Sequence, residues 1–220
     1  MLDIGATDGA PQLGYTSKAE KTKSVGIAFK AVKRVFDVTV CLLLLPLLAA
    51  VALVLVVINP VLNRGPLLFV QKRMGRHCRA FHALKFRTMH TQKAPRRSAD
   101  CPLEVDRITK LGGFLRKTRI DELPQIINVL RGEMSLIGPR PDYFEHALFF
   151  LANVPGYRER HSVRPGISGL AQTELGYVVG TDATRRKVDA DLFYISNSSF
   201  TLEIWVVWRT FMVILGRSGA

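Results

Sequence analysis

The sequence has little cysteine, and its three cysteines follow no metal or disulfide pattern. Cys41, Cys78 and Cys101 are an odd set without CxxC spacing, which argues against a disulfide framework or a zinc site and is typical of reduced cytosolic thiols. The five histidines form no HExxH spacing, and neither a Walker A loop nor a GxSxG nucleophile elbow occurs. The sequence therefore gives no support for a zinc protease, a P-loop NTPase or a serine hydrolase.

Acidic residues are also scarce, at 18 against 31 lysines and arginines, which gives a formal net charge of +13 and a pI near 10.1. Strong basicity is typical of proteins that bind nucleic acid, an anionic membrane surface or polyphosphate substrates. The chain is nevertheless 48% hydrophobic, and an apolar tract beside this charge favours the membrane. At 220 residues the chain can bury one sizeable core, so we expect one catalytic domain with appendages.

The longest hydrophobic run, residues 38–58, contains 21 residues and no charge. As a straight helix it would be about 31 Å long, so a single transmembrane helix is the simplest interpretation. Two features favour a re-entrant helix-break-helix over residues 29–60 instead. Pro46 should break the helix, and Asn59-Pro60 should end its second arm. Basic residues flank both ends, which should keep both ends cytoplasmic: Lys30, Lys33 and Arg34 before the run, and Arg64, Lys72, Arg73, Arg76 and Arg79 after it.

A strongly basic segment follows, with ten lysines and arginines and no acidic residue between positions 64 and 97. Most of these charges should be solvated, and some should face anionic lipid. Within the segment, two apolar runs at 67–70 and 80–84 flank a turn that contains Gly75, which predicts a short β-hairpin. The polar, proline-containing stretch 91–102 predicts a surface loop.

Two further segments have the pattern of helices at a membrane surface. Ile108, Leu111, Phe114 and Leu115 recur at helical spacing, which indicates an amphipathic helix either at the membrane interface or against a core. The stretch Phe200–Leu215 is strongly apolar but short for a membrane span, and its two tryptophans suit the headgroup region. We therefore expect both helices to lie near the membrane surface.

These segments predict an α+β fold that is mostly helical. The first 24 residues are polar, so we expect a flexible N-terminal segment over residues 1–28. The re-entrant membrane helix should occupy residues 29–60. One small catalytic domain over residues 61–220 should carry the β-hairpin and the interfacial amphipathic helices, and should dock on the membrane.

The residues with the clearest chemical potential are the adjacent carboxylates Asp121 and Glu122. Pro124 fits a first helical turn, and the helix should end at Gly132, so the pair should lie at a helix N-terminus. The helix dipole and the nearby Arg116, Lys117 and Arg119 favour ionised carboxylates. An ionised aspartate among cations can attack phosphorus and can bind Mg²⁺. An ordinary acidic helix start is the simpler alternative when the pair is considered alone.

Two arginines beside prolines favour a catalytic role for the carboxylate pair over an ordinary acidic helix start. Pro139 and Pro141 should hold Arg140 in a rigid extended segment, which suits an arginine that binds phosphate. Arg164 precedes Pro165 and several small residues that would permit a ligand to approach closely. Together with the carboxylate pair, these segments favour an enzyme that acts on a phosphorylated substrate.

These segments together resemble the bacterial sugar transferase family, the monotopic polyprenol-phosphate phosphoglycosyl transferases, and most of all its short exopolysaccharide initiators of the ExoY type. The resemblance extends from Lys33 to the C-terminus. Six motifs occur in family order: Lys33-Arg34-Val35-Phe36-Asp37, Phe69-Val70-Gln71-Lys72-Arg73-Met74-Gly75, Lys85-Phe86-Arg87-Thr88-Met89, Asp121-Glu122-Leu123-Pro124-Gln125, Gly138-Pro139-Arg140-Pro141, and Arg164-Pro165-Gly166-Ile167-Ser168-Gly169-Leu170-Ala171-Gln172. Each motif is moderately specific, but six in order are hard to obtain by chance.

The resemblance implies a two-step transfer. Asp121 would attack the β-phosphate of a UDP-sugar and would also bind the Mg²⁺ that assists, and undecaprenyl phosphate would then accept the phosphosugar from the aspartate. Glu122 would act as a base or organise the metal. Arg140 and Arg164 would hold nucleotide phosphate. The implied substrate-binding set is completed by Arg116, Lys85, Arg87, Pro139 and Pro141.

The same resemblance implies the setting of the reaction. The partners would be a UDP-sugar, undecaprenyl phosphate and membrane lipid, with galactose 1-phosphate as the first choice of transferred group and glucose 1-phosphate as the second. The catalytic domain would lie on the cytoplasmic face of the bacterial inner membrane and would begin exopolysaccharide synthesis.

One alternative remains open from the residues alone. A non-catalytic, membrane-anchored binding or scaffold protein would account for the basic charge and the apolar tract. It would leave the carboxylate pair and the Pro139-Arg140-Pro141 segment unexplained. We therefore predict an enzyme without a nucleic-acid partner, and we leave a homodimer open.

Overall fold

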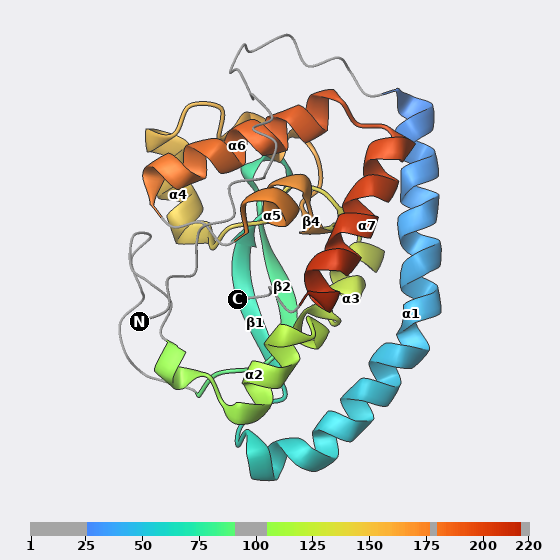
Figure 1. Ribbon diagram of the computed structural model, residues 1–220, viewed down its shortest axis with the longest axis vertical. Helices are drawn as coiled ribbons and strands as arrows, with labels where there is room; N and C mark the ends of the chain where they lie inside the picture. The colour runs from blue at the N-terminus through green and yellow to red at the C-terminus, as the bar shows by residue number, and fades with distance from the viewer. Residues whose placement is uncertain (1–25, 91–104, 177–179, 217–220) are drawn as a thin grey trace, which may run out of the picture.

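The computed structural model describes residues 26–90, 105–176 and 180–216. A long helix runs along one side of a body that is built from shorter helices and two small sheets (Figure 1). The predicted loop at 91–102 lies outside the described residues, as does most of the N-terminal segment expected over 1–28. The described part is mostly helical with short strands, in agreement with the predicted α+β class.

The long helix, α1, is continuous over Ile27–Leu62 and contains both Pro46 and Pro60. Figure 1 shows that α1 changes direction along its second half, and prolines are a usual cause of such bends. The prediction that Asn59-Pro60 ends the helix is wrong. Pro60 lies in the last turn, where Asn63 N–H still donates to the Asn59 carbonyl at 2.9 Å and the Asn59 side chain donates to the Gly65 carbonyl at 2.8 Å.

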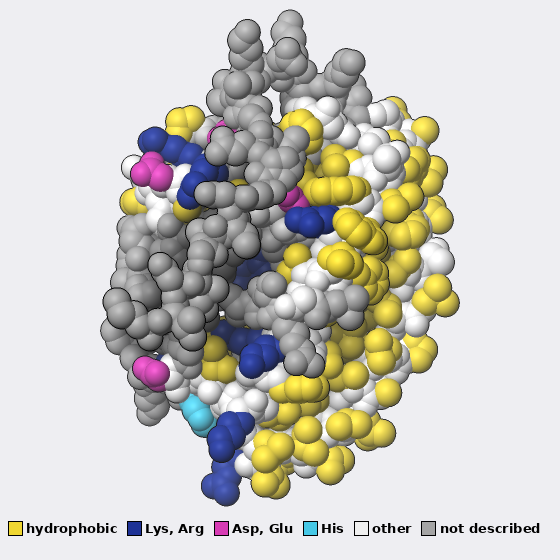
Figure 2. Space-filling model, in the orientation of Figure 1, with side chains coloured by type: hydrophobic (Ala, Val, Ile, Leu, Met, Phe, Trp, Pro, Cys, Tyr) yellow, Lys and Arg dark blue, Asp and Glu magenta, His cyan; other side chains and the backbone are white. Residues whose placement is uncertain are grey.

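Most side chains of α1 point away from the body. Leu43 is 74% exposed and Val57 is 69% exposed, and hydrophobic side chains cover this edge of the molecule in Figure 2. By length and composition, α1 could cross a membrane. A core helix of a soluble protein would be buried, so the exposure of α1 favours contact with lipid.

The predicted hairpin is confirmed. Strands β1, Leu68–Met74, and β2, Ala80–Phe86, pair in antiparallel register. Helix α3, Gln125–Leu130, is attached to β2 by one buried side chain: Asn128 Oδ1 accepts from Leu84 N–H at 3.0 Å, and Asn128 Nδ2 donates to the His82 carbonyl at 2.8 Å. On its other side α3 packs against Cys41 of α1. The segment that contains the carboxylate pair is thereby held between the long helix and the hairpin.

The two predicted amphipathic helices are present as α2, Lys110–Lys117, and α7, Phe200–Leu215. Helix α2 begins after Ile108, because Thr109 caps it by accepting from Gly112 N–H at 2.9 Å. Its apolar residues face both ways, with Leu115 buried and Phe114 58% exposed. Helix α7 exposes a row of large apolar side chains, namely Phe200, Ile204, Trp205, Trp208, Phe211 and Met212.

The rest of the domain surrounds a second small sheet. Strand β3, Ser135–Ile137, pairs in parallel with β4, Gly166–Ser168. Helix α4, Phe144–Asn153, lies on the side away from α1, and α6, Thr181–Ser196, runs from near α4 toward the start of α7 (Figure 1). Helix α5, Leu170–Leu175, follows β4. Short 3₁₀ turns at Arg76–Cys78, Val105–Arg107, Ile120–Glu122 and Glu159–Ser162 connect these elements.

Candidate active site

Asp121 and Glu122 lie in the 3₁₀ turn Ile120–Glu122, between α2 and α3. We expected them in the first turn of the following helix, but that helix is capped by Pro124 and begins only at Gln125. The difference arises because Arg119 has φ +58°, which reverses the chain after α2 so that residues 120–122 form their own short turn. Both carboxylates are buried, with 7% and 5% of the residue exposed.

The Glu122 carboxylate is held by two cations. Arg140 donates through Nη2 to Oε1 at 2.6 Å and through Nη1 to Oε2 at 3.2 Å, and Lys85 Nζ donates to Oε1 at 2.6 Å. Burial alone would raise the pKa of Glu122, but Arg140 and Lys85 hold this pKa well below its usual value. An acid that remains ionised so strongly is a weak proton acceptor, so the geometry favours a role for Glu122 in orienting the two cations.

The Asp121 carboxylate differs from its neighbour, because no hydrogen bond or ion pair reaches it from the residues that the structure describes. Burial raises the pKa of Asp121 above its usual value, and the neighbouring charge of Glu122 adds to this effect, while Lys85, Arg140 and Arg116 oppose it. The pKa values of two adjacent carboxylates are thus displaced in opposite directions. Such divergence is a frequent property of catalytic pairs.

Arg140 reaches Glu122 from the extended segment that follows β3. Two backbone hydrogen bonds attach this segment to β4: Gly138 N–H donates to the Ser168 carbonyl at 2.9 Å, and Gly166 N–H donates to the Pro139 carbonyl at 3.0 Å. A Cβ atom on Gly166 would lie 2.2 Å from the Gly138 nitrogen, so only glycine permits this approach. The backbone therefore fixes where the guanidinium can reach.

A buried ionic cluster holds the backbone of Arg140 in place. Arg160, with no side-chain exposure, donates to the Arg140 carbonyl at 2.8 Å, to Asp142 Oδ2 at 2.7 Å and to Asp191 Oδ2 at 2.8 Å. Lys187 adds a contact of 2.5 Å to Asp142 Oδ1. The cluster joins the Arg140 segment to α6 and to the turn at Glu159–Ser162.

Five of the seven predicted substrate-binding residues gather around the carboxylate pair. Lys85 and Arg140 bind Glu122, and Arg116 lies close enough for its charge to lower the pKa of Asp121 while its Nε donates to Thr88 Oγ1 at 2.9 Å. Pro139 and Pro141 are buried on either side of Arg140.

The structure places Arg87 and Arg164 elsewhere, each bound to backbone carbonyls. Arg87 donates to the carbonyls of Asn63 and Pro66, which fixes the loop between α1 and β1. Arg164 donates to the Gly132 carbonyl at 2.8 Å, beyond the C-terminal end of α3. Neither side chain contacts Asp121 or Glu122 in the described part of the chain. Their role in holding substrate stays a prediction.

Sequence reasoning assigned no role to three polar residues that position the site, although two of them lie in the family motifs. Asn128 attaches α3 to β2, and Gln172 Oε1 accepts from Arg140 Nη1 at 3.3 Å. Asp37 attaches α1 to β3, because its Oδ2 accepts from Ser135 Oγ at 2.7 Å. Asp37 and Asn128 are both lone polar residues at the edge of, or within, an apolar run, and a buried polar residue needs a partner. A polar residue within or beside an apolar run was therefore the sequence feature that could have identified Asp37 and Asn128.

The donor set suits Mg²⁺ better than a metal that needs a protein cage. Among the described residues there is no group of three His, Cys, Asp or Glu side chains that could hold a metal ion. Mg²⁺ commonly uses one or two carboxylates and completes its shell with water and substrate phosphates. The Asp121 carboxylate has no competing partner in the described part of the chain, whereas both oxygens of Glu122 are already bound by cations. Asp121 therefore fits the role of metal ligand better than Glu122 does.

Comparison with known proteins gives a match over nearly the whole chain. The family model described as bacterial sugar transferase matches residues 28–217. The chain is 41% identical over 190 residues to the UDP-N-acetylgalactosamine-undecaprenyl-phosphate N-acetylgalactosaminephosphotransferase of Aeromonas hydrophila, in an alignment that covers 86% of this chain and 45% of that protein. It is 39% identical over 186 residues to the UDP-glucose:undecaprenyl-phosphate glucose-1-phosphate transferase of Caulobacter vibrioides, in an alignment that covers 83% of this chain and 67% of that protein. It is 38% identical over 200 residues to the exopolysaccharide production protein PSS of Rhizobium leguminosarum bv. phaseoli, in an alignment that covers 84% of this chain and 96% of that protein.

Proposed function

Because the chain belongs to the bacterial sugar transferase family, we propose that it transfers a hexose 1-phosphate from a UDP-sugar to undecaprenyl phosphate, with Asp121 as the nucleophile. The predicted family and enzyme class, a sugar-phosphate transferase, are confirmed. The observation that carries the proposed mechanism is the buried Asp121 carboxylate, which has no partner among the described residues and lies among Lys85, Arg116 and Arg140.

In the proposed first step, a carboxylate oxygen of Asp121 attacks the β-phosphorus of the UDP-sugar. The bond between this phosphorus and the bridging oxygen breaks, and UMP leaves with the electron pair. In the second step a phosphate oxygen of undecaprenyl phosphate attacks the same phosphorus, and the bond to Asp121 breaks and regenerates the carboxylate. A covalent intermediate allows a water-soluble donor and a lipid acceptor to react without occupying the site together.

Charge around the site supports this division of roles. Lys85 and Arg140 are fixed on Glu122, so they present positive charge beside Asp121 without reorganising when a diphosphate arrives. Asp121 would hold Mg²⁺ together with the substrate phosphates, and the ion would neutralise part of the phosphate charge. Glu122 would then serve to keep the two cations in place.

We also propose that α1 is re-entrant, with both ends on the cytoplasmic side. The first turns of α1 are attached to α7, because Lys33 Nζ lies 2.5 Å from Glu203 Oε2. The other end is attached to β2, because Asn63 Nδ2 donates to the Arg87 carbonyl at 2.7 Å. Both partners belong to one domain, whereas a helix that spans about 30 Å of hydrocarbon would leave its two ends in different compartments.

Cysteine labelling tests this topology. In a cysteine-free background (Cys41→Ala, Cys78→Ser, Cys101→Ser), single cysteines at Gly26 and at Arg64 should react with a membrane-impermeant maleimide only after the inner membrane is opened. Both positions are exposed in the structure, so neither should be blocked by the protein itself. Reaction of Gly26→Cys in cells with an intact inner membrane would show that α1 spans the bilayer.

A donor panel tests the reaction and the sugar. Purified protein with Mg²⁺ and undecaprenyl phosphate should release UMP from one UDP-sugar in preference to others, and the isotope-labelled sugar phosphate should appear in the lipid. UDP-galactose, our first expectation, is compared with UDP-glucose and UDP-N-acetylgalactosamine, because the last two sugars occur in the names of the relatives. Without the acceptor, mass spectrometry should find a phosphosugar on Asp121. Absence of transfer from every donor would favour the scaffold alternative.

A further inference from the structure

A cavity of about 200 Å³ lies beside the carboxylate pair, between α1, the turn at Ile120–Glu122, α5 and α7. Its walls are mostly apolar and include Leu44 from α1 and Val213 and Ile214 from α7. Its polar residues include Glu122 and Gln172, which also bind Arg140. Sites that enclose a whole small molecule typically measure about 300–1,000 Å³, so this cavity suits one end of a larger ligand.

Arg119 provides the second observation. Its side chain lines the cavity, and it makes no hydrogen bond or ion pair with any residue that the structure describes. The only other charged residue in the lining is Glu122, whose charge is already balanced by Lys85 and Arg140. The cavity therefore carries an unbalanced positive charge and favours an anionic group.

The backbone of Arg119 is also unusual, because its φ of +58° lies in the left-handed region that side chains other than glycine rarely adopt. Strain of this kind persists only where the surrounding structure imposes it, and it is frequent at ligand sites. Here it turns the chain sharply between α2 and the carboxylate pair, and it places an arginine in the wall of the cavity that Glu122 also lines.

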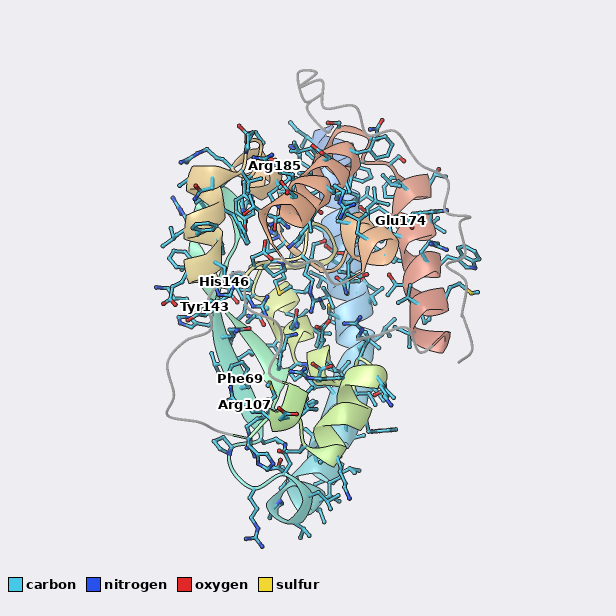
Figure 3. The ribbon with its side chains drawn as sticks, turned by 60° about the vertical axis from the view of Figure 1, so that its left-hand side comes forward. Phe69, Arg107, Tyr143, His146, Glu174 and Arg185 are labelled. Atoms are coloured by element: carbon cyan, nitrogen blue, oxygen red, sulfur yellow. The ribbon has the colours of Figure 1, made fainter. Side chains whose placement is uncertain are left out.

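The two helices that form apolar walls of the cavity also expose apolar side chains on the surface of the molecule. Helix α7 exposes Trp208 and Phe211, and α1 exposes Leu43 and Leu47 next to the cavity residue Leu44. Helix α5 is attached to α7 by an ion pair between Glu174 and Arg209 at 3.2 Å, and Figure 3 shows Glu174 on the α7 side, away from His146 of α4. A ligand could thus have its anionic end at Arg119 and its hydrocarbon in the bilayer.

We propose that Arg119 binds the phosphate of the polyprenyl phosphate acceptor, and that the first part of its hydrocarbon chain lies between α1 and α7. This inference rests on the proposed function and assigns the acceptor to one wall of that same site. The cations Lys85, Arg140 and Arg116 remain for the phosphates of the UDP-sugar. The occupant we commit to is a lipid with a single terminal phosphate, because the cavity combines one unbalanced cation with walls from α1 and α7, the two helices that expose the most large apolar side chains.

Steady-state kinetics on the full chain in lipid nanodiscs separates the two substrates. In a double-displacement reaction, kcat/KM for each substrate reports only the step in which that substrate reacts. We expect Arg119→Gln to lower kcat/KM for undecaprenyl phosphate by about 10- to 100-fold, the usual effect of losing a charged hydrogen bond, and to leave kcat/KM for the UDP-sugar within about twofold. Arg119→Lys should recover part of the loss. The positive φ at position 119 is equally unfavourable for arginine, glutamine and lysine, so the variants should not differ in backbone strain.

Two further variants keep the inference testable. Lys117→Gln removes the same charge two residues away, from an exposed side chain on α2 that does not line the cavity, and it should leave both values unchanged. Val213→Trp should fill the cavity and lower kcat/KM for the acceptor alone. An equal loss for both substrates in Arg119→Gln, or no loss, would overturn the inference, as would an equal effect of Lys117→Gln. If the wild-type chain transfers no sugar phosphate to lipid, the proposed function itself fails, and that outcome is distinct from both.

Discussion

Replacing Asp121 with asparagine should abolish transfer, with a loss in kcat of at least ~10³-fold and no detectable phosphosugar on the protein. Asparagine has nearly the same shape as aspartate but cannot form the acyl phosphate bond that the proposed mechanism requires. UMP release from the preferred UDP-sugar, measured with and without undecaprenyl phosphate, checks the loss in both steps. Turnover of Asp121→Asn at the wild-type rate would contradict the proposed mechanism.

The same variant should be at least as stable as the wild type, which separates chemistry from folding. Burial raises the pKa of Asp121, which means that the folded protein disfavours the ionised form. No described residue forms a hydrogen bond with this carboxylate, so the neutral amide removes a buried charge without leaving a partner unsatisfied. Thermal unfolding in detergent should therefore give an equal or higher Tm for Asp121→Asn. A large fall in Tm would mean that Asp121 supports the fold.

Replacing Arg160 with methionine should give the largest loss of stability among the substitutions considered, about 3–5 kcal/mol, because it leaves buried carboxylates without their cation. Arg160 has no side-chain exposure and contacts both Asp142 and Asp191 at 2.7 Å. It also holds the backbone carbonyl of Arg140, so kcat should fall even in molecules that remain folded. Urea unfolding in detergent and the donor assay measure the two effects.

An exposed arginine provides the control for this prediction. Arg185, labelled on α6 in Figure 3, has 56% of its side chain exposed and forms a single ion pair with Asp182 at 3.6 Å. Arg185→Met should change the free energy of unfolding by less than about 0.5 kcal/mol. The double variant Arg160→Met with Asp191→Asn should lose less than the sum of the single variants, because the two side chains contact each other. Equal stability of Arg160→Met and Arg185→Met would contradict a stabilising role for the cluster.

The parts of the fold that follow from local pattern could be predicted from the sequence. The apolar segment Phe200–Leu215 became α7 with the same ends, and the two apolar runs around Gly75 became the hairpin. The end of α1 could not be predicted in the same way. Proline usually ends a helix, but α1 continues two residues beyond Pro60, where Asn63 N–H still donates to the Asn59 carbonyl and the Asn59 side chain donates to the Gly65 carbonyl.

The candidate site could also be predicted only in part. The motifs contain the residues that carry charge near Asp121, and the structure places Lys85, Arg116 and Arg140 beside the carboxylate pair. The sequence could not show that Arg140 and Lys85 bind Glu122, because these residues are 18 and 37 positions from it and meet only through the tertiary fold. Nor could it show that Arg87 and Arg164 bind backbone carbonyls, since a charge visible in a sequence does not reveal its partner.

The attachment of both ends of α1 to one domain has a consequence for how the protein reaches its membrane. A spanning helix requires the cell to translocate whatever polar chain precedes or follows it, at a large desolvation cost. In the re-entrant arrangement that we propose, the folded domain would lower the bent apolar helix into one leaflet without breaking the contact of Lys33 with Glu203 or that of Asn63 with the Arg87 carbonyl. Insertion can then follow folding, and it would displace lipid from the near leaflet alone.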